Sequence, residues 1–161
     1  MELTEQSPVV LRSCRPEDLD QVIKINEICL PENYPRSFFV EHLINFPKAF
    51  IVAETDGKIV GYVMTRVEKG FSFYGMKWVT KAHIISLAVL PQYRRRGIGT
   101  ALMKKAHEGA KEYGATEIYL EVRVNNDEAI ALYKKLSYEI KDVNANYYSD
   151  GEDAYIMVAH L

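Results

Sequence analysis

One segment near the middle of the chain decides the fold. It reads Leu87-Ala88-Val89-Leu90-Pro91-Gln92-Tyr93-Arg94-Arg95-Arg96-Gly97-Ile98-Gly99-Thr100. An apolar run ends in a proline turn, and three arginines then precede two glycines that open a predicted helix. Glycines there let a ligand approach the backbone, and the first N–H groups of a helix have no partner within it. Because these donors and the helix dipole attract anions, the segment predicts a phosphate or pyrophosphate site.

Two other phosphate-binding motifs do not match this segment. A P-loop requires Gly-Lys-Ser/Thr, whereas Gly99 is followed directly by Thr100. A dinucleotide fingerprint requires Gly-x-Gly-x-x-Gly, which is absent as well. Three arginines alone would be read most simply as a solvated basic turn before an amphipathic helix. Together with the preceding strand and the glycines, they favour a bound pyrophosphate.

Apolar periodicity on both sides of this segment predicts alternating strands and helices. Helices are expected over residues 16–30, 36–44, 97–113 and 126–136, and strands over 9–13, 49–54, 58–68, 82–90, 116–124, 138–147 and 153–159. Residues 69–81, which contain two glycines and four aromatic residues, are expected to form a loop with one buried face. The strand at 82–90 is nearly all apolar and is expected to be covered on both faces. The pattern predicts an α/β fold with a mixed sheet.

The composition predicts one globular domain over residues 1–161, with 26% charged residues. The 20 Lys and Arg residues nearly balance the 22 Asp and Glu residues, for a net charge of -2. This balance excludes a strongly basic, nucleic-acid-binding body. The longest uncharged apolar stretch, residues 82–93, is shorter than the ~20 residues that span a bilayer, so no membrane contact is expected.

The cellular location of the protein is predicted from the start of the chain and from the two cysteines. Glu2, Glu5 and Arg12 have no apolar run between them, so no signal peptide is expected. Cys14 and Cys29 are too few for a disulfide framework or a four-ligand metal site. They are expected to be reduced thiols of a cytoplasmic protein.

Through Arg94-x-x-Gly97-x-Gly99 and its context, the sequence resembles the GNAT acetyltransferase superfamily. The resemblance implies the GNAT fold, an α/β arrangement with a mixed, mostly antiparallel twisted sheet flanked by about four helices. It also implies acetyl-CoA as co-substrate. The pantetheine arm would pair with Leu87, Ala88 and Val89 like an added strand. The pyrophosphate would be held by Arg94, Arg95, Arg96, Gly97, Ile98, Gly99 and Thr100.

A second segment, residues 125–136, resembles another signature of this superfamily. The resemblance implies that Asn126 contacts the coenzyme and that Tyr133 lies near its sulfur. The structural alternatives are a helix N-cap for Asn126 and a core aromatic for Tyr133.

Three further blocks, residues 30–35, 120–126 and 147–155, resemble the catalytic subunits of N-terminal acetyltransferase A in their compact archaeal form. The resemblance implies transfer of acetyl to a protein N-terminus by direct attack in a ternary complex. Ser, Ala and Thr termini are expected as substrates, with Met-Leu termini as a second class, and the sequence requires no auxiliary subunit. The implied substrate-binding residues are Leu30, Pro31, Glu32, Tyr34, Tyr147 and Tyr148.

The catalytic base has two candidates. An α-amine has a pKa of ~7.7–8.0, so a base must deprotonate the charged fraction near neutral pH. Glu32 could act directly from the substrate loop. His83 and Glu121 lie where family members hold a catalytic water and are the alternative. Tyr133 could return a proton to the departing thiolate. No metal is predicted, because His83 and Glu121 alone are too few ligands.

Two other functions are compatible with the same sequence features. One is a GNAT acetyltransferase for a ribosomal protein or a small amine. The other is a coenzyme-A-binding module without turnover.

Overall fold

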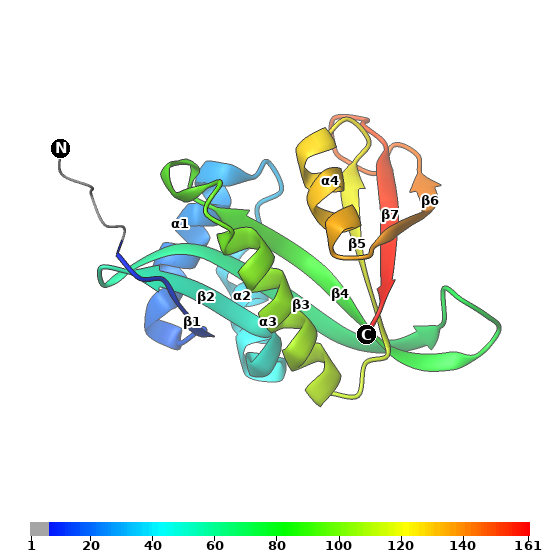
Figure 1. The fold of residues 1–161 in the computed structure, drawn as a ribbon, viewed down its shortest axis with the longest axis horizontal. Coiled ribbons are helices and arrows are strands. Elements are labelled where there is room, and N and C mark those ends of the chain that lie inside the picture. The colour runs from blue at the N-terminus through cyan, green and yellow to red at the C-terminus, as the bar shows by residue number, and fades with distance from the viewer. Residues whose placement is uncertain (1–6) are drawn as a thin grey trace. The chain divides into compact units, whose positions relative to one another are not determined.

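The computed structural model describes residues 7–161, so Glu2 and Glu5, on which the expectation about targeting rests, lie outside the described residues. The strands are β1 (Val10–Ser13), β2 (Phe50–Thr55), β3 (Lys58–Phe71), β4 (Trp78–Val89), β5 (Glu117–Arg123), β6 (Glu139–Asn144) and β7 (Ala154–His160). The α-helices are α1 (Leu19–Cys29), α2 (Arg36–Asn45), α3 (Ile98–Glu112) and α4 (Asp127–Lys135) (Figure 1). Short 3-10 turns at Pro16–Asp18, Pro47–Ala49 and Pro91–Tyr93 each begin with a proline.

The sheet has the strand order β1-β2-β3-β4-β5-β7-β6. The pairs β1–β2, β2–β3, β5–β7 and β6–β7 are antiparallel, and β4–β5 is parallel. This confirms the predicted α/β fold with a mixed, mostly antiparallel sheet and four helices. The chain comprises two compact units: one contains the described residues up to Met64 and Ser86–Ala106, the other Thr65–Ile85 and His107–Leu161.

In the first unit, successive residues of β3 face opposite sides of the sheet. The ring of Tyr62 lies 6.5 Å from that of Phe39 in α2. A Cβ atom at the preceding residue, Gly61, would lie 3.1 Å from the Ala88 carbonyl oxygen and 3.3 Å from the Leu102 side chain of α3. A glycine at position 61 therefore allows β3, β4 and α3 to approach closely.

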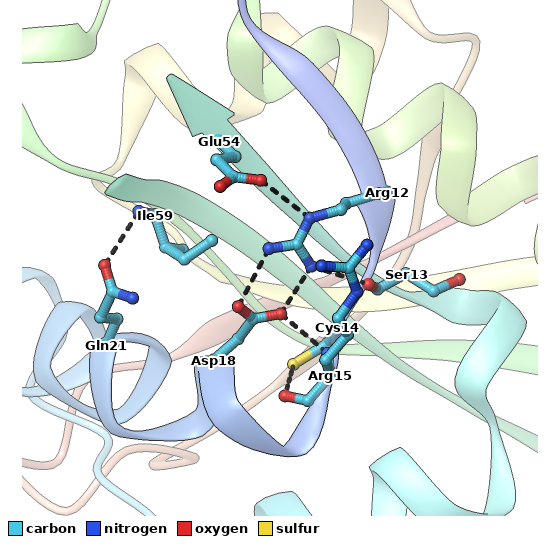
Figure 2. A network of polar contacts seen from close by, with 8 residues as sticks. All are labelled: Arg12, Ser13, Cys14, Arg15, Asp18, Gln21, Glu54 and Ile59. Carbon is cyan, nitrogen blue, oxygen red and sulfur yellow. Dashed lines mark hydrogen bonds and ion pairs between the residues drawn. The ribbon is translucent and has the colours of Figure 1, made fainter. Parts of the chain in front are cut away.

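The start of the described chain is held by an ion-pair network (Figure 2). The Arg12 guanidinium donates to both carboxylate oxygens of Asp18 at 2.6 and 3.0 Å and to Glu54 at 2.9 Å. Burial opposes ionisation of Asp18, but the bonds from Arg12 and from the Arg15 amide lower its pKa. The network ties β1 to β2 and to the turn that starts α1.

In the second unit, β5 pairs with β7 along its whole length. The buried Glu117 carboxylate accepts hydrogen bonds at 2.7 Å from both the Ser72 hydroxyl and the Phe73 amide. His107 in α3 lies 2.7 Å from the hydroxyl of the buried Tyr138. These contacts fix the β3–β4 connection and the chain after α4.

Three expectations about local structure were wrong. Residues 69–81 do not form one long loop, because β3 continues to Phe71 and β4 begins at Trp78. Gly70 belongs to the strand, where a Cβ would meet the Lys81 side chain at 3.1 Å. The first strand of the final hairpin is Glu139–Asn144 rather than residues 138–147, and Asn146 in the following turn has a positive φ of 53°.

The third correction concerns β4, which is not covered on both faces. Ala82, Ile84, Ser86 and Ala88 are buried, whereas the residues that alternate with them are only half-buried. His83, Leu87 and Val89 therefore share the more accessible face of the strand.

No helix within residues 7–161 is both long and apolar enough to cross a membrane. Cys14 and Cys29 are free thiols, and burial raises the pKa of Cys14 to about 12.

Acid should destabilise the protein through His107. Burial, with a smaller effect of Lys111, lowers the pKa of His107 from 6.5 to about 4 in the folded state. Below pH 6.5 the unfolded chain therefore binds a proton that the folded chain does not, and stability is lost as the pH falls toward 4. The loss from this one group should be on the order of 2–3 kcal/mol near pH 4.

Urea unfolding of the wild type and of His107→Gln between pH 7.5 and 4.5 measures this loss. Carboxylates titrate in both proteins, so the wild type should lose more unfolding free energy than the variant. Parallel curves for the two proteins would contradict the assignment.

Candidate active site

The predicted site residues fall into two groups, one in each compact unit. Residues 30–34, 87–89 and 94–100 belong to the first unit. His83, Glu121, Asn126, Tyr133, Tyr147 and Tyr148 belong to the second. Each group is built from its own local contacts.

The predicted phosphate turn joins β4 to α3. Arg95 and Gly97 have left-handed backbone angles, with φ of 63° and 78°, and α3 begins immediately afterwards at Ile98. The Ala101 amide donates to the Gly97 carbonyl at 3.0 Å, so the amides of the preceding three residues lie in the first helical turn, where no carbonyl of the helix can accept from them. The turn therefore presents backbone donors at the positive end of a helix dipole, which suits a pyrophosphate.

Two of the three arginines brace this turn. The Arg94 Nε donates to the Val89 carbonyl at 2.9 Å. The Arg96 guanidinium lies 5.2 Å from the centre of the Tyr93 ring. Both side chains remain exposed, as does Arg95, so the turn carries positive charge at its surface. The sequence predicted the charge but not the bracing contacts.

One carbonyl at the end of β4, that of Val89, already accepts hydrogen bonds. The Val89 carbonyl accepts from Arg94 and also from the Cys29 thiol, at 3.7 Å. The β4–β5 ladder runs from Lys81–Glu117 to His83–Tyr119, and Leu87 lies four residues beyond its end. The Val89 carbonyl is therefore bonded within this unit, the Ala88 carbonyl lies close to Gly61 of β3, and Leu87 lies beyond the part of β4 that pairs with β5.

In the second unit, the ladder brings His83 and Glu121 together. His83 is in register with Tyr119, so Glu121 lies two residues further along β5 on the same face. The His83 Nε2 is 2.6 Å from the Glu121 Oε1, and their side chains are only 19% and 13% exposed. The Tyr147 hydroxyl donates to the same carboxylate oxygen at 3.3 Å. A carboxylate at Nε2 favours the tautomer that carries its proton there, which leaves Nδ1 as an acceptor.

Two residues beside this pair, Tyr119 and Glu68, were not predicted from the sequence. The Tyr119 ring stacks on the His83 imidazole, with centroids 4.2 Å apart and planes 11° from parallel. The Tyr119 hydroxyl donates to Glu68 on β3, and burial together with this carboxylate raises the pKa of Tyr119 well above its usual value. The signal available in the sequence was the position of Tyr119 two residues before Glu121 on a strand.

Tyr133 and Asn126 belong to α4. Asn126 is the N-cap of the helix, because its side-chain oxygen accepts from the Ala129 amide at 3.2 Å. The Tyr133 ring lies 5.8 Å from that of Tyr138. Part of the Tyr133 side chain reaches solvent, yet burial raises its pKa to about 12, so it keeps its proton at neutral pH. The structural alternative is therefore present for Asn126, whereas Tyr133 is only partly buried, and the coenzyme contacts of both residues stay predictions.

The final hairpin holds Tyr147 and Tyr148. Their rings meet edge to face, with centroids 4.9 Å apart. The Arg123 guanidinium lies 4.0 Å from the centre of the Tyr148 ring and donates to Asp150 at 2.9 Å. The turn closes at Gly151, whose φ is 87° and whose amide donates to the Tyr148 carbonyl at 2.9 Å. These contacts fix Tyr147 where its hydroxyl reaches Glu121.

The predicted substrate loop follows α1. Leu30 is the C-cap of the helix, and its amide donates to the Asn26 carbonyl at 3.0 Å. Asn33 donates to the carbonyls of Leu30 and Asn26, at 3.0 and 3.2 Å. Tyr34 stacks on Phe38 with ring centroids 4.7 Å apart, and Glu32 is half-buried. The loop is thus fixed by contacts at both ends.

In the described part of the chain, no three His, Cys, Asp or Glu side chains are grouped so that they could hold a metal ion.

Comparisons with known proteins identify the family of the chain. The model of the acetyltransferase (GNAT) family matches residues 19–138. The chain is 55% identical to a Sulfurisphaera tokodaii protein named N-alpha-acetyltransferase over 154 residues, which cover 94% of this chain and 92% of that protein.

Two solved structures are similar over nearly the whole chain. Ard1 from Thermoplasma volcanium has a TM-score of 0.82 and 31% identity, covering 95% of this chain and 97% of its own. Arabidopsis thaliana Naa50 in complex with the bisubstrate analogue CoA-Ac-MVNAL has a TM-score of 0.82 and 29% identity, covering 95% and 99%. With the family model matching most of its length, the chain belongs to the acetyltransferase (GNAT) family.

Proposed function

We propose that the protein is an Nα-acetyltransferase, which transfers acetyl from acetyl-CoA to the free α-amine of a protein N-terminus. The observation that carries the proposal is the likeness, over almost the full length, to the Sulfurisphaera tokodaii relative of that name. We further propose Ser, Ala and Thr termini as preferred substrates, with Met-Leu termini as a second class. A cytoplasmic location is consistent with the two free cysteines.

The turn between β4 and α3 is proposed to hold the pyrophosphate of the coenzyme. The first-turn amides of α3, the left-handed Gly97 and three exposed arginines all favour an anion there. The end of β4, at Leu87, Ala88 and Val89, is proposed to pair with the pantetheine arm. A backbone amide of the same strand is the natural donor to the oxyanion that develops on the thioester.

The reaction forms one bond and breaks one bond. The α-amine nitrogen attacks the thioester carbonyl carbon, the C–S bond breaks, and the amine loses a proton while the thiolate gains one. We assign the base to His83, oriented by Glu121, because their 2.6 Å contact leaves the other imidazole nitrogen as an acceptor. Glu32 would then contact the substrate ammonium group, and Tyr133 would supply the proton to the thiolate.

A peptide panel tests the function. The purified chain, without any partner, should acetylate peptides beginning with Ser, Ala and Met-Leu at least tenfold faster than a peptide whose only amine is an internal lysine, because the site is proposed to recognise the terminal backbone. Mass spectrometry of the products locates the acetyl group. Acetylation of the lysine peptide or of a small amine alone would contradict N-terminal transfer, and coenzyme binding without any product would indicate a non-catalytic module.

Replacement of single residues separates the two candidate bases. His83→Gln should lower kcat by ~10²-fold or more, the usual contribution of a general base, and Glu121→Gln should lower it by about tenfold. Glu32→Gln should mainly raise the KM for the peptide. Glu128→Gln, on the exposed start of α4, is the matched control. If Glu32→Gln removes activity while His83→Gln retains it, the assignments must be exchanged.

Tyr133→Phe tests the proton donor. The change removes only the hydroxyl. With acetyl-CoA as the thioester, kcat should therefore fall by about tenfold or more, while the KM for acetyl-CoA stays constant. Steady-state kinetics at pH 7.5 measure the effect. Unchanged acetyl transfer would remove Tyr133 from the mechanism.

A further inference from the structure

A polar cluster is buried inside the first unit, where apolar side chains would be expected. Asn26 of α1 and Tyr62 of β3 are fully buried, and Ser86 of β4 is 5% exposed. The Asn26 Nδ2 donates to the Tyr62 hydroxyl at 3.2 Å, and the Tyr62 and Ser86 oxygens are 2.6 Å apart. Burial of polar groups opposes folding unless each is hydrogen-bonded, and apolar residues of similar size would fill this space without that demand. Packing of the core alone therefore does not account for these polar residues.

The outer end of the cluster holds the substrate loop. The Asn26 Nδ2 also donates to the Glu32 carbonyl at 3.0 Å, and the Asn26 Oδ1 accepts from the Asn33 Nδ2 at 3.2 Å. Asn33 is at the same time bonded to the main chain of Asn26 and Leu30. One buried amide thus fixes the backbone of Glu32 and the side chain of its neighbour.

The inner end of the cluster reaches β4. Ser86 directly precedes Leu87 and Ala88, the residues proposed to pair with the coenzyme. The Tyr62 oxygen accepts from Asn26 and shares a second hydrogen bond with the Ser86 hydroxyl, in which either group can donate. Burial raises the pKa of Tyr62 to about 12, so the phenol keeps its proton throughout the neutral range. A second link runs in parallel, from the Cys29 thiol to the Val89 carbonyl.

We propose that Asn26, Asn33 and Tyr62 are positioning residues, which fix the backbone of the substrate loop against the strand that holds the coenzyme. The inference rests on the proposed function, because it assigns the loop to the acceptor peptide. These residues touch neither substrate. They act by holding residues 30–34 in one conformation, so the acceptor peptide meets a preformed surface rather than ordering the loop itself.

Two variants test the positioning role with little risk to folding. Asn33→Ala changes an exposed side chain, and Tyr62→Phe removes one hydroxyl and leaves the ring packed. Each should lower kcat/KM for a peptide substrate by about tenfold, while the KM for acetyl-CoA stays within about twofold. The double variant should lose less than the product of the two single losses, because both act through the same loop. Asn45→Ala and Tyr113→Phe, outside the cluster, are matched controls.

Hydrogen exchange gives a readout that does not depend on activity. The amides of Leu30, Glu32, Asn33 and Tyr34 should exchange about tenfold faster in both variants than in the wild type, whereas those of α2 should not change. Unchanged loop exchange, or equal loss of kcat/KM for peptide and acetyl-CoA in well-folded variants, would overturn the positioning role. A wild type that acetylates no peptide would refute the proposed function, and loop exchange would still decide whether the cluster fixes the loop.

Discussion

The alternation of side chains along β4 is the constraint on which the rest of the site depends. One set of residues, Ala82, Ile84, Ser86 and Ala88, is buried, and the other set includes His83, Leu87 and Val89. A one-residue slip of this strand would exchange the two sets, so burial of the first set also fixes which face carries the imidazole of His83. Packing and chemistry are thus specified by the same register.

Charge is distributed by this architecture in a way that the net value of -2 conceals. Arg94 and Arg96 do not simply surround an anion, because one bonds the end of β4 and the other lies against Tyr93. In the proposed site, the backbone N–H groups at the start of α3 would attract a phosphate together with the exposed charge of the arginines. In the second unit, the negative charge of Glu121 is shared between His83 and Tyr147.

Local signals in the sequence predicted the elements well, and non-local contacts explain what they missed. The Asp56-Gly57 turn and the stop at Gly114 both have the left-handed angles that such residues favour. Gly70 led to the wrong prediction of a loop, because this glycine lies within β3, where a Cβ would contact the Lys81 side chain of β4. The stacking of Tyr119 on His83 and the bond from Asn26 to Tyr62 join residues 36 positions apart. No spacing rule connects such pairs; only the strand register and helix packing do.

Gly61 is a position where substitution would affect activity without any contact to substrate. It touches no substrate in the proposed mechanism, yet any side chain there would press on the Ala88 carbonyl and on Leu102 at the same time. Substitutions at position 61 would therefore lower activity by displacing β4 and α3, without removing any reacting group. A lost activity at this position would reflect the spacing of β3, β4 and α3 rather than chemistry.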